Sequence, residues 1–210
     1  SVSITVATNS VTATATGSSD TLSGLSKYQY SLNNSTWQDS GTFSGIKSGT
    51  QTTVYARAVD KVGNVSASIS NKGTTSSIGA VTITQSPAAG TWTKGNVTVT
   101  LSYANIPTGY VMQYKIGSGN WTAYSSALTV SENNTKITAR LYNSSVNDEV
   151  SVSSKTVANI DKGTPSSATI ALSSTSTNTI SSITAVVKQE DSLSGLDITN
   201  CKWVYNTTST

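Results

Sequence analysis

Short runs in which apolar and polar side chains alternate recur along the chain. In residues 27–32, Tyr28, Tyr30 and Leu32 fall on one face, and Gln29 and Ser31 on the other. A period of two is typical of half-buried strands, and no stretch keeps the 3.6-residue period of a helix. These runs predict strands at residues 3–7, 11–16, 27–32, 43–46, 52–60 and 65–69, and at 81–85, 97–103, 110–116, 121–124, 128–130, 135–142 and 150–157.

The sequence also repeats at the length of a domain. Four positions recur 83 or 84 residues later, in the pairs Tyr30/Tyr114, Trp37/Trp121, Ala56/Ala139 and Arg57/Arg140. A third copy begins later still, because residues 191–196 (DSLSGL) repeat residues 20–25 (DTLSGL). A repeat of this length is a whole domain and not a solenoid unit.

The predicted fold is all-β, with tandem Ig-like (fibronectin III-like) β-sandwich domains, two complete and one partial. Many short strands separated by frequent turns are typical of such sandwiches. We expect domains at residues 1–75 and 76–161, joined by a polar linker at 70–77, and the N-terminal part of a third at 162–210. In the third, strands are expected from Ala168, from Ile180 and at 200–205. Their missing neighbours would come from further polypeptide or from a second chain.

Two motifs resemble known modules. Residues 49–60 (GTQTTVYARAVD), followed by Gly63 and Asn64, are similar to strand F and the FG turn of fibronectin type III modules. The whole unit, with YQYS…W and ARAVDKVGNVS, is more similar to the bacterial Ig-like repeats of large Gram-positive surface proteins. The fibronectin tyrosine-corner position falls on Thr52, which favours the Ig-like class. The resemblance implies a spacer that holds another domain away from the envelope, or a decoration of a phage tail or capsid.

Composition narrows the classes of function. About a third of the residues are Ser or Thr, and the three prolines and the alternating strands favour ordered β structure over a mucin-like stalk. The formal charge of +3 is spread without a basic cluster, so no nucleic-acid partner is predicted. No apolar run approaches a membrane span. The chain opens on a predicted strand and not on a signal peptide, so if the parent protein is exported we expect this chain to be an internal piece of it.

Candidate chemistry is sparse. The absence of histidine removes Ser-His-Asp and Cys-His catalysis, no cofactor motif occurs, and the single Cys201 is predicted to be a buried small hydrophobe. Asp20 with Asp191, and Asp60 with Asn64, are predicted to hydrogen-bond turns in preference to binding calcium. Three acidic residues of the second domain are predicted to be solvated: Glu132, Asp148 and Glu149. Lysine–Asn crosslinks have no supporting motif, and the eight Asn-X-Ser/Thr sequons are ascribed to composition.

The aromatic residues are the remaining candidates for binding a ligand. Their repeated spacing predicts a sandwich core more than a sugar platform. This core signature comprises Tyr30, Trp37, Tyr114, Trp121 and Trp203. Trp92 has no counterpart in the first domain, lies in a loop-like stretch, and is the possible ligand contact.

The sequence therefore predicts a non-enzymatic extracellular spacer of a bacterial cell-surface, adhesin-like protein. No catalytic residue, metal site or cofactor is predicted. The expected partners are adjacent domains of the same polypeptide or assembly, and a surface glycan or protein. Two alternatives stay open: a bacteriophage virion appendage or decoration protein, and a carbohydrate-binding module.

Overall fold

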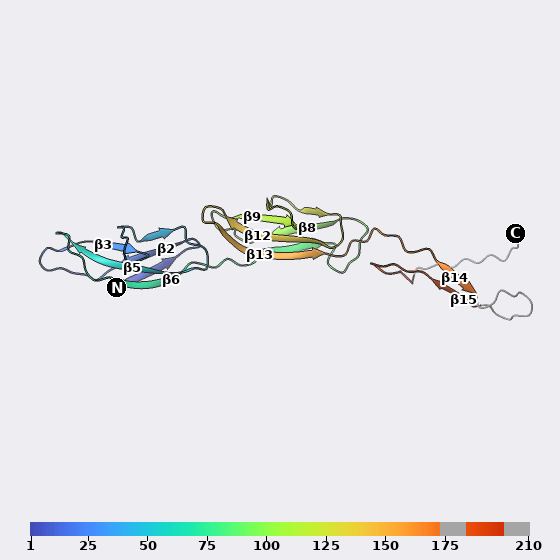
Figure 1. The fold of residues 1–210 in the computed structure, drawn as a ribbon, viewed down its shortest axis with the longest axis horizontal. Helices are drawn as coiled ribbons and strands as arrows, with labels where there is room; N and C mark the ends of the chain where they lie inside the picture. The colour runs from blue at the N-terminus through green and yellow to red at the C-terminus, as the bar shows by residue number, and fades with distance from the viewer. Residues whose placement is uncertain (173–183, 200–210) are drawn as a thin grey trace, which may run out of the picture. The chain divides into compact units, whose positions relative to one another are not determined.

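The computed structural model describes residues 1–172 and 184–199, and every regular element in these residues is a β-strand (Figure 1). The all-β prediction is confirmed. The chain divides into two compact units. The first comprises Ser1–Ile83, Leu101–Ser126 and Lys136–Lys155, and the second comprises Thr84–Thr100, Ala127–Thr135 and the described part of Thr156–Thr210. Nowhere in the described residues is there a helix that could cross a membrane.

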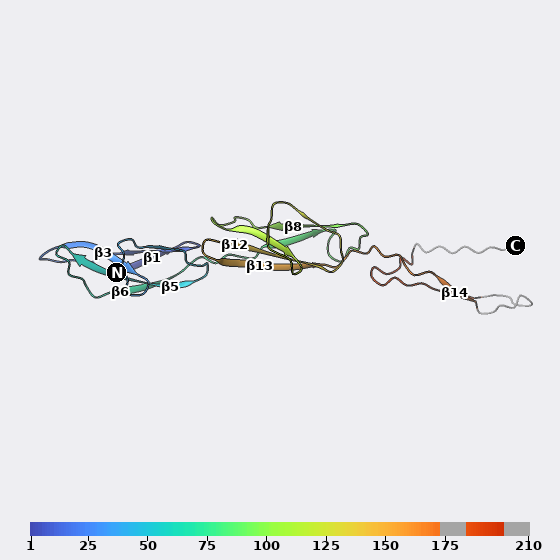
Figure 2. The same ribbon diagram turned by 45° about the horizontal axis from the view of Figure 1, so that its top comes forward.

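The first six strands form two three-stranded sheets, which we call the first sandwich. One sheet has the order β1 (Val2–Val6), β2 (Ser10–Ala15), β4 (Thr42–Ser44), and the other β3 (Leu25–Ser31), β5 (Gln51–Asp60), β6 (Ile69–Thr74). This order corresponds to strands A-B-E and C-F-G of Ig-like sandwiches. The strands can be followed in Figure 1, and Figure 2 shows them turned by 45°.

The core of the first sandwich is made mostly of small side chains. Alternate residues of β2 and β5 point inward because successive side chains of a strand face opposite ways. The buried cluster consists of Val11, Ala13, Ala15, Tyr30, Val54 and Ala56, with Phe43 and Ile46 packed against it. Tyr30 is the one large side chain in this buried set, and its hydroxyl accepts a hydrogen bond from the backbone N–H of Ala15 (3.1 Å). This bond ties the two sheets together.

The last strand of the first sandwich differs from the prediction. Residues 70–77 were expected to be a polar linker, whereas β6 runs from Ile69 to Thr74 and pairs with β5 from Ala56↔Ile69 to Gln51↔Thr74. Ser70, Asn71 and Lys72 are exposed, so this edge strand shows no apolar alternation to reveal it. A Cβ on Gly73 would lie 2.4 Å from the Cγ2 of Ile4, so only glycine fits beneath β1.

Strands β7 to β13 form two further sheets, which we call the second sheet pair. One has the order β11 (Leu128–Val130), β8 (Val97–Ser102), β7 (Thr82–Ser86). The other has the order β10 (Thr122–Ala123), β9 (Val111–Ile116), β12 (Thr135–Asn143), β13 (Asp148–Val157). Ala139 pairs with Tyr114 as Ala56 pairs with Tyr30, so the sequence repeat is also a repeat of strand register.

The described part of the third repeat contains an antiparallel pair of strands, β14 (Thr169–Leu172) and β15 (Ala185–Lys188). Strand β14 begins one residue after the expected start at Ala168, whereas the expected start at Ile180 lies outside the described residues. Ile170, Leu172 and Val186 are all exposed on this pair of strands. Cys201, Trp203 and Tyr205 lie outside the described residues.

Candidate functional site

The repeated tyrosines occupy equivalent places in the two sets of sheets. Tyr30 is buried, with an exposed fraction of 8%. Tyr114 is half-buried and meets Tyr124 edge-on, with ring centroids 6.3 Å apart. The Tyr124 hydroxyl accepts a hydrogen bond from the backbone N–H of Leu101 on β8 (3.1 Å). In each set, one tyrosine hydroxyl thus receives a backbone N–H from the neighbouring sheet.

The repeated tryptophans lie outside the buried core, which differs from the predicted core signature. Trp37 and Trp121 are both half-buried. The guanidinium of Arg57 lies 4.3 Å from the ring centroid of Trp37, and that of Arg140 lies 4.0 Å from that of Trp121. Each arginine alternates with the buried alanine beside it, so its side chain leaves the opposite face of the sheet. The tryptophans therefore cover the outer faces of β5 and β12.

Each of these arginines is also fixed by a glutamine on the neighbouring strand. Nε and Nη2 of Arg57 both donate to Oε1 of Gln29, at 3.1 and 2.8 Å. The same two atoms of Arg140 donate to Oε1 of Gln113, at 2.9 and 2.8 Å. We call these groups the Gln–Arg–Trp stacks. Because a guanidinium covers one ring face, stacking of a sugar on that face is blocked.

The other aromatic candidate, Trp92, is 39% exposed in the connection between β7 and β8. Its neighbour Thr93 pairs in parallel with Ile160, and Thr93 N–H donates to the carbonyl of Asn159 (3.0 Å). Asn159 is buried and donates to the carbonyls of Ala88 (3.1 Å) and Thr91 (2.7 Å). The loop that carries Trp92 is therefore held firmly while the indole stays accessible.

The acidic turn residues serve their own loops. Oδ1 of Asp20 accepts from the N–H groups of Leu22 (2.7 Å) and Ser23 (3.2 Å). Oδ1 of Asp60 accepts from the N–H groups of Val62 and Asn64, at 3.0 and 2.8 Å. Desolvation works to raise the pKa of Asp60, but hydrogen bonds from Asn64 and Ser23 outweigh it and lower that pKa to about 2. Among the described residues, no three metal-ligating side chains gather.

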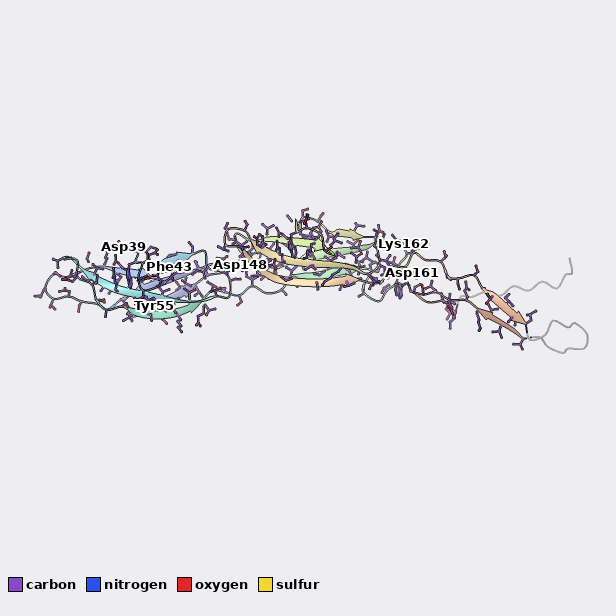
Figure 3. All side chains as sticks on the ribbon, viewed as in Figure 1. Asp39, Phe43, Tyr55, Asp148, Asp161 and Lys162 are labelled. Atoms are coloured by element: carbon purple, nitrogen blue, oxygen red, sulfur yellow. The ribbon has the colours of Figure 1, made fainter. Side chains whose placement is uncertain are left out.

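A buried polar cluster lies where the sequence predicted only solvated loops. Asp148 begins β13, and its exposed fraction is only 4%. Asp148 is labelled in Figure 3. Its Oδ2 accepts hydrogen bonds from the Tyr110 hydroxyl and from the N–H of Ser48 (2.8 Å). Asn9 Nδ2 donates to that hydroxyl (3.0 Å), and Asn143 Nδ2 lies 3.4 Å from Asn9 Oδ1. We call these five residues the Asp148 cluster, all of which belong to the first compact unit.

The Asp148 cluster joins segments about a hundred residues apart in sequence. Asn9 and Ser48 come from the β1–β2 and β4–β5 connections of the first sandwich, and Tyr110, Asn143 and Asp148 from the ends of β9, β12 and β13. Glu132 and Glu149 are exposed as predicted, so the prediction was wrong for Asp148 alone. The sequence carried no signal for the cluster, because its members are a tyrosine at the end of a strand and polar residues of separate turns, which only folding brings together.

The electrostatics of the cluster favour a charged Asp148. Burial works to raise its pKa, but hydrogen bonds from Tyr110 and Ser48 and the nearby Lys47 ammonium together lower the pKa below its ordinary value. Burial and the neighbouring Asp148 carboxylate raise the pKa of Tyr110, so the phenol stays protonated and donates. A charged acceptor with two donors is a strong, directional fastening between parts of a fold.

No known protein family and no characterised protein matches this sequence. Among solved structures, fibronectin(III)-like modules of CbhA from Clostridium thermocellum align with 77% of this chain and 95% of theirs, at 13% identity and a TM-score of 0.26. Chitinase ChiA74 from Bacillus thuringiensis aligns at 20% identity and a TM-score of 0.31, with 77% of this chain but only 26% of the chitinase covered.

Proposed function

We propose that this chain is a non-catalytic structural module, a series of β-sandwiches that spaces other domains in an extracellular bacterial surface protein. The observation that carries the proposal is the Asp148 cluster, which fastens the first sandwich to the ends of β9, β12 and β13. A spacer needs such a fastening, since a flexible joint would let its domains fold back.

The repeated Gln–Arg–Trp stacks support the same proposal. They cover the outer faces of β5 and β12 with groups that satisfy one another. In the first sandwich the remaining outer surface is rich in Ser, Thr and Asn. A module whose task is to keep its shape benefits from strands whose outer side chains are fixed.

The test is a measurement of backbone ¹⁵N relaxation in the intact chain. We expect residues of the first sandwich and of β9, β12 and β13 to share one rotational correlation time. Asp148→Ala should separate the two times, because it removes the acceptor of Tyr110 and Ser48. Glu132→Ala, an acidic residue that is exposed, is the control. Separate tumbling in the unmodified chain would contradict the proposal.

A second candidate, carbohydrate binding, is favoured by one observation, the accessible indole of Trp92 on a firmly held loop. A glycan array decides this point. Binding that is lost in Trp92→Ala and kept in Trp37→Ala would assign a glycan-binding role to the loop. If the array shows no specific signal, the structural role is the only one that remains.

A further inference from the structure

One end of the first sandwich presents a preformed, partly apolar surface. The β2–β3 connection (residues 20–25) and the β5–β6 connection (residues 60–64) are tied by hydrogen bonds from Ser23 Oγ to Asp60 Oδ2 (2.8 Å) and from Lys61 N–H to the Gly24 carbonyl (3.0 Å). On this surface Leu22 is 97% exposed and Val62 73% exposed. We call it the loop end. Both side chains are open to contact with a neighbouring module.

The equivalent end of the second sheet pair already holds a neighbour. The β12–β13 turn corresponds to the β5–β6 turn, since the order β9-β12-β13 repeats the order β3-β5-β6. Val146 lies in this turn. It is half-buried, and its Cγ1 lies 3.9 Å from the Cβ position of Gly45 in the first sandwich.

The third repeat uses the same kind of loop in the same way. Its residues 191–196 match residues 20–25, and the Ser194 N–H donates to Oδ2 of Asp161 (3.0 Å). Asp161, labelled in Figure 3, follows the last strand of the second sheet pair. Asp161 is buried, and Leu193, the counterpart of Leu22, is 47% exposed. In the first sandwich, the corresponding Ser23 N–H donates to Asp20 of the same loop.

The loop end carries one ammonium beside two carboxylates. The Lys61 ammonium lies 3.4 Å from the Cβ position of Gly24, and Asp20 and Asp60 accept hydrogen bonds from the N–H and the Oγ of Ser23. A visiting carboxylate would take the place of Asp20 at the Ser23 N–H and would gain the Lys61 ammonium as a partner.

We propose that the loop end of the first sandwich receives the last segment of another module of this kind, through a carboxylate equivalent to Asp161 and an apolar contact over Leu22 and Val62. The occupant we name is a second copy of residues 76–169. This inference rests on the proposed spacer function and adds to it a defined head-to-tail docking face.

The test places residues 76–169 directly before Ser1 of the full chain. This junction follows the repeat, because Ala171↔Val186 of the third repeat corresponds to Val2↔Ala15 of the first. In a Cys201→Ser background, maleimide labelling of Leu22→Cys is timed with and without the added copy. Docking should slow labelling by about tenfold or more, as expected for a contact that must open first.

Two controls make the result specific. Ser35→Cys, exposed in the turn after β3, should label equally fast with and without the added copy. Asp161→Ala in the added copy alone should restore fast labelling of Leu22→Cys. Equal labelling of Leu22→Cys in both chains, with the added copy folded by its amide spectrum, would overturn the proposal.

A measurement without the fusion tests the same docking rule. In the unfused chain, Asp161→Ala should speed the labelling of Leu193→Cys several-fold, since the Ser194 N–H loses its acceptor. An unchanged rate would overturn the proposal even if the fusion failed to fold. Neither labelling result depends on whether the Asp148 cluster is stiff. The spacer proposal is therefore tested separately, by the ¹⁵N relaxation measurement.

Discussion

Asp148 shows how much the role of a single side chain depends on its surroundings. Asp148 and its neighbour Glu149 are both acidic, yet the first is buried among donors and the second is exposed and paired with Arg140. A buried carboxylate is tolerated only where donors replace the water it has lost. Tyr110 and Ser48 supply those donors, so changes at either partner should be felt strongly.

The Tyr110 hydroxyl gives the first prediction. Tyr110→Phe leaves Asp148 and Asn9 each without one partner in a buried place, so it should lower the free energy of unfolding by about 1–3 kcal/mol. Urea denaturation of the intact chain measures this loss. Tyr142→Phe is the control, because its hydroxyl bonds Asn147 at an exposed site. Equal losses in the two variants would argue against a special role for the cluster.

The second prediction concerns acid. The pKa of Asp60 is about 2 in the folded chain and 3.8 ordinarily, so the folded form binds the proton less readily. The stabilisation is therefore complete above about pH 4 and is lost as the pH falls towards 2. NMR titration of the Asp60 carboxyl gives the pKa directly. Asp60→Asn should make the first sandwich less sensitive to acid, whereas Glu132→Gln should not.

At the scale of elements, β6 shows why a polar stretch can be a strand. Its backbone pairs with β5 along six residues while its exposed side chains stay in water. What fixes its place is the close approach of Gly73 to Ile4 and Val6 of β1. The place of such a strand depends more on the absence of a side chain at Gly73 than on alternation of apolar and polar residues.

Gly73 gives the third prediction. Gly73→Val would place methyl groups where Ile4 already lies, and overpacking of this kind costs about 1–3 kcal/mol. Thermal unfolding should show a clear drop in the midpoint. Ser70→Val, on the same strand but exposed, should change stability by about 0.5 kcal/mol or less. A neutral Gly73→Val would mean that β6 lies farther from β1 than described.

The Gln–Arg–Trp stacks give the fourth prediction. A double-mutant cycle of Arg57→Leu and Trp37→Ala should yield a coupling of about 0.5–1 kcal/mol, the range of partly exposed cation–π pairs. The cycle of Arg57→Leu with Tyr55→Ala serves as the control, since in the described part of the chain the Arg57 guanidinium lies over the ring of Trp37 and not over that of Tyr55. Strict additivity for Arg57 and Trp37 would show that the ring and the guanidinium merely lie close.

At the scale of the whole molecule, the sequence predicted the positions of the strands and the repeat better than the contacts between repeats. Alternation marks β2, β5, β8 and β12, because their inner faces are apolar and their outer faces polar. The tryptophans were wrongly predicted to lie in the core. An aromatic residue on an outer face, covered by an arginine, repeats as regularly along the sequence as one in a core. The Asp148 cluster was invisible because hydrogen-bond partners a hundred residues apart leave no local periodicity.

The first and last segments of the first sandwich, around β1 and β6, lie next to each other, and this arrangement has a mechanical consequence. Asn71 Nδ2 donates to the carbonyl of Val2 (2.9 Å), and five residues further along both segments the Ser76 N–H donates to that of Ala7 (3.1 Å). The incoming and outgoing segments therefore run side by side in the same direction. When the chain is stretched, the two segments are pulled along their own axes in opposite directions. The bonds that join them are loaded in shear and must rupture together, so the sandwich resists stretching along the direction in which a tether is pulled.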